Sequence, residues 1–317
     1  MIKNAGLDAI DICTPPFMHK EVALAAAEAG IHVYCEKPLA PYASDAREMA
    51  QACREAGVCL TVGSGRRRVS GEAQAARRAI AQGLLGEVYL AKVGRCRSLG
   101  RPGYDMPQLA SWFFDSSKAG GGTMYDIGCY DVNLILYLTG APQPRTISAM
   151  AYQGFEYDGR FDHPFDVEEH AVAFVRCDNL SIVIESAWAR HAPPEDRDAI
   201  RVYGNKAGLT SLTTLARATG FNKVEEIPLE PAEPIDFYED FVRACQEGRD
   251  PISPGEDAVK EMEILSGALL SAYLGREVSV EEVYEIESLR SLPTRGWVTR
   301  RSPGAINVSP ADKAAGL

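Results

Sequence analysis

The sequence predicts an α/β unit with a parallel sheet, followed by an α+β domain in which helices cover a mostly antiparallel sheet. Three observations support this prediction. Short apolar segments alternate with helical ones at the start of the chain, strand-like segments with few helices fill its middle, and two helical segments precede the C-terminal tail. We place the first unit at residues 1–68, the second domain at 69–280 and a C-terminal extension at 281–317.

The first unit alternates strands with helices. Apolar strands and alanine-rich helices are predicted, in chain order, at 8–13, 19–29, 31–35, 44–56 and 58–62. Each short crossover returns the chain over the sheet, so the strands are parallel. Ligands of such sheets bind beyond the carboxyl ends of the strands. The loops at those ends contain Thr14-Pro15-Pro16, Glu36-Lys37-Pro38 and Gly63 through Arg68.

The second domain is rich in strands, which are predicted at 86–98, 145–153, 168–177, 180–188 and 198–203. Helices are predicted at 123–139, 236–247 and 256–274, the last with an apolar stripe typical of core packing. Such helices cover one face of an antiparallel sheet. We expect the other face to pair with a second subunit, giving a homo-oligomer, either a dimer or a tetramer.

The composition excludes several classes of partner. The formal net charge is −11, and the one basic run is Arg66-Arg67-Arg68, so neither nucleic acid nor an anionic membrane is expected to bind. No apolar stretch approaches the ~20 residues of a membrane span. The eight cysteines form no C-x-x-C pair, and the first residues do not resemble a signal peptide. We therefore predict reduced thiols and a cytoplasmic location.

A complete dinucleotide-binding domain begins with a strand, a glycine-rich turn and a helix that faces the pyrophosphate. No G-x-G-x-x-G occurs in this sequence, and about seven residues precede the first predicted strand. We expect a partial Rossmann-type sheet that binds a dinucleotide weakly or not at all. Either the start was assigned too late or the protein is naturally shortened.

Two clusters are candidates for chemistry. Lys37 follows the second strand, where its charge can lower the pKa of a bound hydroxyl, although most lysines are simply solvated. Downstream, Asp126 and Tyr130 follow a run of three glycines and lie four residues apart, on one helix face. An acid and a phenol so placed can move a proton or hold a sugar diol. Equally, they can be a helix cap and a core residue.

The two clusters in combination, E-K-P at 36–38 and GGGTMYDIGCY at 120–130, resemble the motifs of the Gfo/Idh/MocA oxidoreductases. The resemblance covers residues 7 to about 280. It implies that Lys37 faces substrate and nicotinamide, and that Lys37, Asp126 and Tyr130 are catalytic. Most relatives have histidine where this chain has Tyr130, whose ordinary pKa of ~10 requires a nearby cation for it to act as a base.

Other residues match the family in part. Thr14, Pro15 and His19 match T-P-x-x-x-H, whose loop lies along the cofactor, and Glu36 belongs to the same cofactor side. Arg67 and Trp112 match substrate-binding positions, although Arg68 replaces the aromatic residue that usually follows the arginine. Without the resemblance, a solvated turn and a core tryptophan explain them equally well. The acidic stretch from His163 to His170 lacks metal-ligand spacing, so no metal is expected.

The resemblance implies an NAD- or NADP-dependent dehydrogenase that transfers a hydride between nicotinamide and a hydroxyl of a sugar, polyol or glycoside. The alternative is a non-redox sugar-binding or assembly subunit that has lost its nucleotide site. A third possibility is glycoside cleavage through transient oxidation. The sequence names neither the sugar nor the choice between NAD and NADP.

Overall fold

The structure is a computed structural model that describes residues 6–106, 111–155, 165–193 and 198–289. Its N-terminal part is a three-stranded parallel sheet of order β1-β2-β3. The strands and the two crossover helices are β1 (Ala9–Ile12), α1 (His19–Glu28), β2 (His32–Cys35), α2 (Ala43–Glu55) and β3 (Leu60–Val62). The predicted order of strands and helices and their parallel direction are confirmed.

The second sheet has nine strands among the described residues, in the order β11-β10-β9-β8-β4-β7-β6-β5-β12. Its neighbours are antiparallel except β4 and β7, which run parallel. The mostly antiparallel prediction is therefore confirmed. The strands are β4 (Val88–Cys96), β5 (Pro144–Tyr152), β6 (His170–Cys177), β7 (Ser181–Ala187), β8 (Asp198–Gly204), β9 (Gly208–Ser211), β10 (Thr214–Gly220), β11 (Lys223–Pro228) and β12 (Val278–Ser279).

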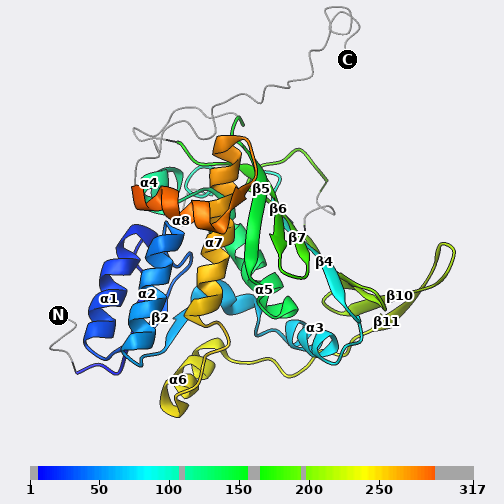
Figure 1. Cartoon of the computed structure of the whole chain (residues 1–317), viewed down its shortest axis with the longest axis horizontal. Helices are drawn as coiled ribbons and strands as arrows, with labels where there is room; N and C mark the ends of the chain where they lie inside the picture. Colours follow the sequence, from blue (N-terminus) through cyan, green and yellow to red (C-terminus); the bar gives the residue numbers. More distant parts are fainter. Residues whose placement is uncertain (1–5, 107–110, 156–164, 194–197, 290–317) are drawn as a thin grey trace, which may run out of the picture.

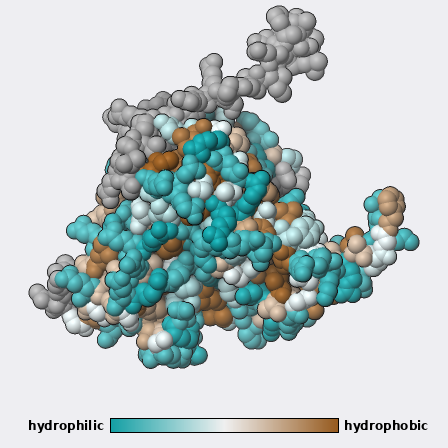
Figure 2. Space-filling view, in the orientation of Figure 1, coloured by the Kyte–Doolittle hydropathy of each residue, from teal (hydrophilic) through white to brown (hydrophobic). Residues whose placement is uncertain are grey.

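The β10–β11 hairpin extends away from the rest of the sheet (Figure 1). In the space-filling view it stands clear of the body of the molecule (Figure 2). Phe221 at its turn is 93% exposed. β9, β10 and β11 were not predicted from the sequence: the side chains of β10 and β11 are mostly solvated and give no apolar alternation, and β9 is only four residues long.

Helices fill the space between and beside the two sheets (Figure 1). α7 packs against α2 on one side and against β5 on the other, so it joins the two parts of the core. The helices that follow β3 in the chain are α3 (Gly71–Ala81), α4 (Ser116–Ala119), α5 (Cys129–Thr139), α6 (Phe237–Glu247), α7 (Gly255–Leu274) and α8 (Val280–Leu289). α3 was not predicted from the sequence, although Ser70 caps it by accepting a hydrogen bond from the Ala73 amide.

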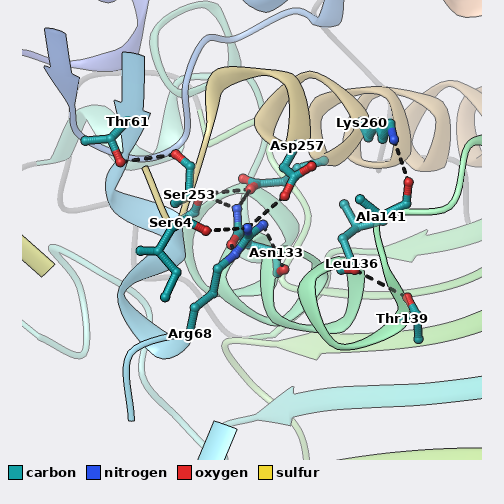
Figure 3. Close-up of polar contacts among 12 residues, drawn as sticks. Thr61, Ser64, Arg68, Asn133, Leu136, Thr139, Ala141, Ser253, Asp257 and Lys260 are labelled. Atoms are coloured by element: carbon teal, nitrogen blue, oxygen red, sulfur yellow. Dashed lines mark hydrogen bonds and ion pairs between the residues drawn. The ribbon is translucent and has the colours of Figure 1, made fainter. Parts of the chain in front are cut away.

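A buried polar network closes the seam between the two sheets (Figure 3). Arg68, which follows β3, donates to Asp257 Oδ2 at 2.7 Å, to the Ile252 carbonyl at 2.8 Å and to Asn133 on α5. Its side chain is only 1% exposed. The carboxylate of Glu261 on α7 accepts from Asn133 as well, at 2.8 Å. These bonds fix the end of β3 relative to α5 and α7, which is the geometry that the candidate site requires.

α8 lies against α2 and α7 and therefore packs on the body of the protein. It falls within the segment assigned above to a C-terminal extension. The remainder of that segment, from residue 290, lies outside the described residues.

Candidate functional site

His19 links two of the loops at the carboxyl ends of the parallel strands. Its ring is fully buried, and Nε2 lies 2.7 Å from the Thr14 carbonyl oxygen. Nδ1 lies 3.1 Å from the carbonyl oxygens of Pro38 and Leu39. Burial lowers the pKa of this imidazole below its usual value. The structure thus places His19 between the T-P-P and E-K-P loops, where it holds them together.

Lys37 extends from the end of β2 toward the second domain. Its ammonium donates to Asp126 Oδ1 and to the Asp126 carbonyl oxygen, both at 2.7 Å. Burial alone would lower the pKa of Lys37, but the Asp126 carboxylate more than offsets this and raises it above its usual value. Lys37 is therefore a cation at neutral pH.

Asp126 lies in a π-helical turn, Met124–Gly128, that leads into α5. Such turns are rare and often mark functional sites. Its second carboxylate oxygen, Oδ2, accepts from the indole Nε1 of Trp188 at 2.9 Å. Trp188 directly follows β7, is completely buried and is not among the predicted site residues.

Tyr130 lies in the first turn of α5, and the Lys37 Nζ atom is 5.1 Å from the centroid of its ring. The predicted grouping of Lys37, Asp126 and Tyr130 is thus present in space. Burial raises the pKa of the Tyr130 phenol, and the charge of Lys37 opposes that rise in part. Because the phenol stays protonated near neutrality, it is ready to donate a proton.

The glycine run allows the π-helical turn to approach the second sheet closely. A Cβ atom on Gly122 would lie 2.0 Å from the Glu168 carbonyl oxygen, so no side chain fits there. The carboxylate of Glu168 accepts hydrogen bonds from the backbone amides of Gly122, at 2.8 Å, and Met124, at 2.9 Å. Burial raises the pKa of Glu168 to about 7. Gly120 has a φ of +84°, which favours glycine for a second reason.

Glu36 forms an ion pair with Arg66, a contact that the sequence analysis did not predict. Arg66 also approaches the Tyr238 hydroxyl on α6, at 3.4 Å. Arg67, the predicted substrate residue, forms an ion pair with Asp131.

A cavity of about 190 Å³ opens between the loops and the π-helical turn. Of the predicted residues, Thr14, Glu36, Lys37, Trp112 and Asp126 line it. Phe113, which was not predicted, lines it too, and its ring stacks on Trp112 with centroids 4.1 Å apart. Its lining does not include the other predicted residues, which are Pro15, His19, Arg67 and Tyr130.

The described acidic residues near β6 bind other parts of the protein. Asp166 accepts from the Ser116 amide at 2.8 Å, and Glu169 pairs with Arg101 at 3.2 Å. His170 lies 3.0 Å from Glu185. His163 lies outside the described residues. Among those described, no group of three or more potential ligands could hold a metal ion. Nor do they include a helix with the length and apolar character of a membrane span.

Two models of one protein family match different parts of the chain. Residues 1–64 match the model described as "Oxidoreductase family, NAD-binding Rossmann fold", and residues 73–210 match "GFO/IDH/MocA C-terminal domain". These matches confirm the family predicted from the motifs.

Curated relatives are similar over varying lengths. D-glucoside 3-dehydrogenase of Escherichia coli (strain K12) is 29% identical over 211 residues, which are 64% of this chain and 58% of that protein. The match thus spans less than two thirds of that relative. 1,5-anhydro-D-fructose reductase of Ensifer adhaerens is 28% identical over 295 residues, which are 89% of this chain and 82% of that protein.

The fold agrees with these similarities. A crystal structure of aldose-aldose oxidoreductase from Caulobacter crescentus, complexed with glycerol, superposes with a TM-score of 0.69 at 27% identity. It covers 88% of this chain and 81% of that one. Both the motifs and the arrangement of the two sheets therefore lead to one conclusion: the chain belongs to the Gfo/Idh/MocA family of oxidoreductases.

Proposed function

We propose that this protein transfers a hydride between a nicotinamide cofactor, NAD or NADP, and a secondary hydroxyl of a sugar, polyol or glycoside. The observation that carries the proposal is the position of Lys37. Lys37 and Asp126 both line the cavity, and the Lys37 ammonium bonds Asp126 at 2.7 Å and lies 5.1 Å from the centroid of the Tyr130 ring. The relatives named above, whose names denote reactions of glucosides, anhydro-sugars and aldoses, support the substrate class.

The cavity fits a bound polar group on its cofactor side. Within the described part of the chain, the Thr14 hydroxyl oxygen is buried without a hydrogen-bond partner, and Thr14 lines the cavity. Such a group requires a partner, and a bound cofactor can provide one. We propose that Thr14, Pro15 and Glu36 hold the cofactor side, while His19 supports their loops. When bound, the nicotinamide accepts or supplies the hydride.

The roles of the remaining residues follow from their charges. In oxidation, the carbinol carbon loses its hydride while the hydroxyl loses its proton, so negative charge develops on the oxygen. Lys37, as a cation, stabilises that charge and lowers the pKa of the hydroxyl. In oxidation the phenolate form of Tyr130 takes up the hydroxyl proton, and in reduction the phenol donates it back, while Asp126 holds Lys37. Trp112 offers an aromatic surface for a sugar ring, and we place Arg67 at the edge of the substrate site.

The test is the steady-state oxidation of a panel of cyclic polyols, aldoses and glycosides by the protein, with NAD and NADP in turn. Lys37→Met and Tyr130→Phe should each lower turnover about 10²- to 10⁴-fold, with smaller effects on substrate binding. Lys20→Met is the matched control, since Lys20 pairs with Asp45 on the surface of α1 and α2.

Two results would overturn the proposal. One is turnover of Lys37→Met and Tyr130→Phe at the rate of the parent. The other is a parent that binds sugars in calorimetric titrations yet reduces neither cofactor, which would support a non-redox sugar-binding subunit instead.

We also propose that the protein is a homo-oligomer that pairs through the second sheet. α7 covers one face of that sheet, while Met150 and Tyr152 on β5 are 45% and 44% exposed on the other. Met150 is paired across the sheet with Val172 of β6, so the apolar surface continues onto a second strand. Analytical ultracentrifugation should detect a dimer or tetramer, and Met150→Lys should dissociate it. A parent that sediments as a monomer at micromolar concentration would contradict this.

A further inference from the structure

We propose that Trp188 is a positioning residue for the hydride transfer. Its indole N–H fixes the carboxylate of Asp126, and through that carboxylate the ammonium of Lys37. The inference rests on the proposed function, and it adds a residue that neither the family motifs nor the sequence analysis identified. It also assigns Asp126 a defined role, that of an anchor.

The two oxygens of Asp126 have different partners. Oδ1 accepts from Lys37 Nζ at 2.7 Å, and Oδ2 accepts from Trp188 Nε1 at 2.9 Å. Both oxygens are therefore engaged from opposite sides. A carboxylate held in this way fixes its cationic partner, because one oxygen carries the ion pair with Lys37 while the bond from Trp188 to the other oxygen holds the group in one orientation.

Trp188 is itself rigid. Its side chain is completely buried, and its backbone amide donates to the Glu169 carbonyl oxygen at 2.8 Å. The ring packs edge-on against Phe114, with centroids 6.1 Å apart and an interplanar angle of 82°. Ile127, adjacent to Asp126, belongs to the same apolar cluster. The indole N–H therefore points at Asp126 from a fixed position.

A second contact holds the same strand end to the π-helical turn. The Ser186 hydroxyl, two residues before Trp188, donates to the Thr123 carbonyl oxygen at 3.0 Å and lies 2.9 Å from the Thr123 hydroxyl. β7 thus determines where the turn lies, and Trp188 determines how its carboxylate is oriented. The second sheet consequently positions Lys37, which lies in the loop that follows β2 of the first sheet. Trp188 and Asp126 are 62 residues apart in sequence, and Asp126 and Lys37 are 89 residues apart.

The variant that tests this is Trp188→Phe, which removes the N–H and keeps most of the ring. Since one hydrogen bond to a charged group is lost, kcat should fall about 10- to 100-fold while KM for the sugar changes less. Phe114→Leu is the control, because it disturbs packing against the same ring and leaves the hydrogen bond in place. It should retain kcat within about threefold.

A second measurement does not depend on turnover. The protein contains three tryptophans, so its ¹⁵N-indole spectrum is simple, and Trp188→Phe assigns the resonance of Trp188. Asp126→Asn weakens the acceptor and should shift that resonance upfield, while Lys20→Met should leave it unchanged. The inference is overturned if the Trp188 indole resonance does not shift in Asp126→Asn, or if Trp188→Phe has the turnover rate of the parent. A parent without turnover overturns the proposed function instead, and the resonance alone then decides whether Trp188 holds Asp126.

Discussion

Arg68 should contribute more to stability than a surface arginine that joins the same two parts of the protein. Its guanidinium is almost fully buried and bonds Asp257, at the start of α7, and Asn133 (Figure 3). It also donates to the Ile252 carbonyl. Arg68→Met leaves these groups without their donor in the interior. Removing one partner of a buried ion pair costs about 3–5 kcal/mol. The Asp257 side chain keeps 18% exposure, so we expect a loss near the lower end, about 3 kcal/mol.

Arg54 provides a matched control. It pairs at 2.7 Å with Glu256, the residue before Asp257, but the two side chains are 64% and 48% exposed. An exposed pair contributes about 0–1 kcal/mol, so Arg54→Met should change little. Urea unfolding, followed by far-UV circular dichroism and by tryptophan fluorescence, measures both variants. If Arg68→Met lowers the free energy of unfolding no more than Arg54→Met does, the buried network does not stabilise the seam.

Three further predictions concern stability and pH. Gly122→Ala places a methyl group 2.0 Å from a backbone oxygen and should lower the free energy of unfolding, measured in urea, by at least about 3 kcal/mol. Gly57→Ala, where the methyl group meets open space, should lower it by about 1 kcal/mol. Equal losses in the two variants would contradict the close approach at Gly122. Burial raises the pKa of Glu261 from 4.5 to about 7. Ionisation of Glu261 therefore opposes folding. Between about pH 5 and pH 8 the free energy of unfolding of the parent should fall by up to about 3 kcal/mol more than that of Glu261→Gln. If the carboxyl group has an ordinary pKa, the two proteins should show no such difference. Because the pKa of Tyr130 is raised above its ordinary value, sugar oxidation should still be rising with pH at about pH 10, whereas Tyr130→His should level off near about 7; identical pH–rate profiles would remove Tyr130 from proton transfer.

Much of the fold is encoded locally. The alternation of β1, α1, β2, α2 and β3 follows from apolar segments of strand length and alanine-rich segments of helix length. Neighbouring residues suffice to recognise both. The E-K-P and G-G-G–D-I-G motifs were recognised for the same reason, since each lies within a short continuous stretch. α3 was also encoded locally, by Ser70 and the alanine-rich segment after it, and was overlooked.

The contacts that organise the candidate site are not local, and only the tertiary structure decided them. Lys37 meets Asp126 across 89 residues of sequence, and Asp126 meets Trp188 across 62. A tryptophan after an apolar strand indicates burial, but the partner of its N–H depends on how the second sheet packs on the π-helical turn. The ion pair between Glu36 and Arg66 likewise depends on the alignment of β2 with β3. The sequence by itself therefore determined which residues are candidates for the chemistry, while the packing of the two sheets determined which charges they face, because electrostatic partners are set by distance in space.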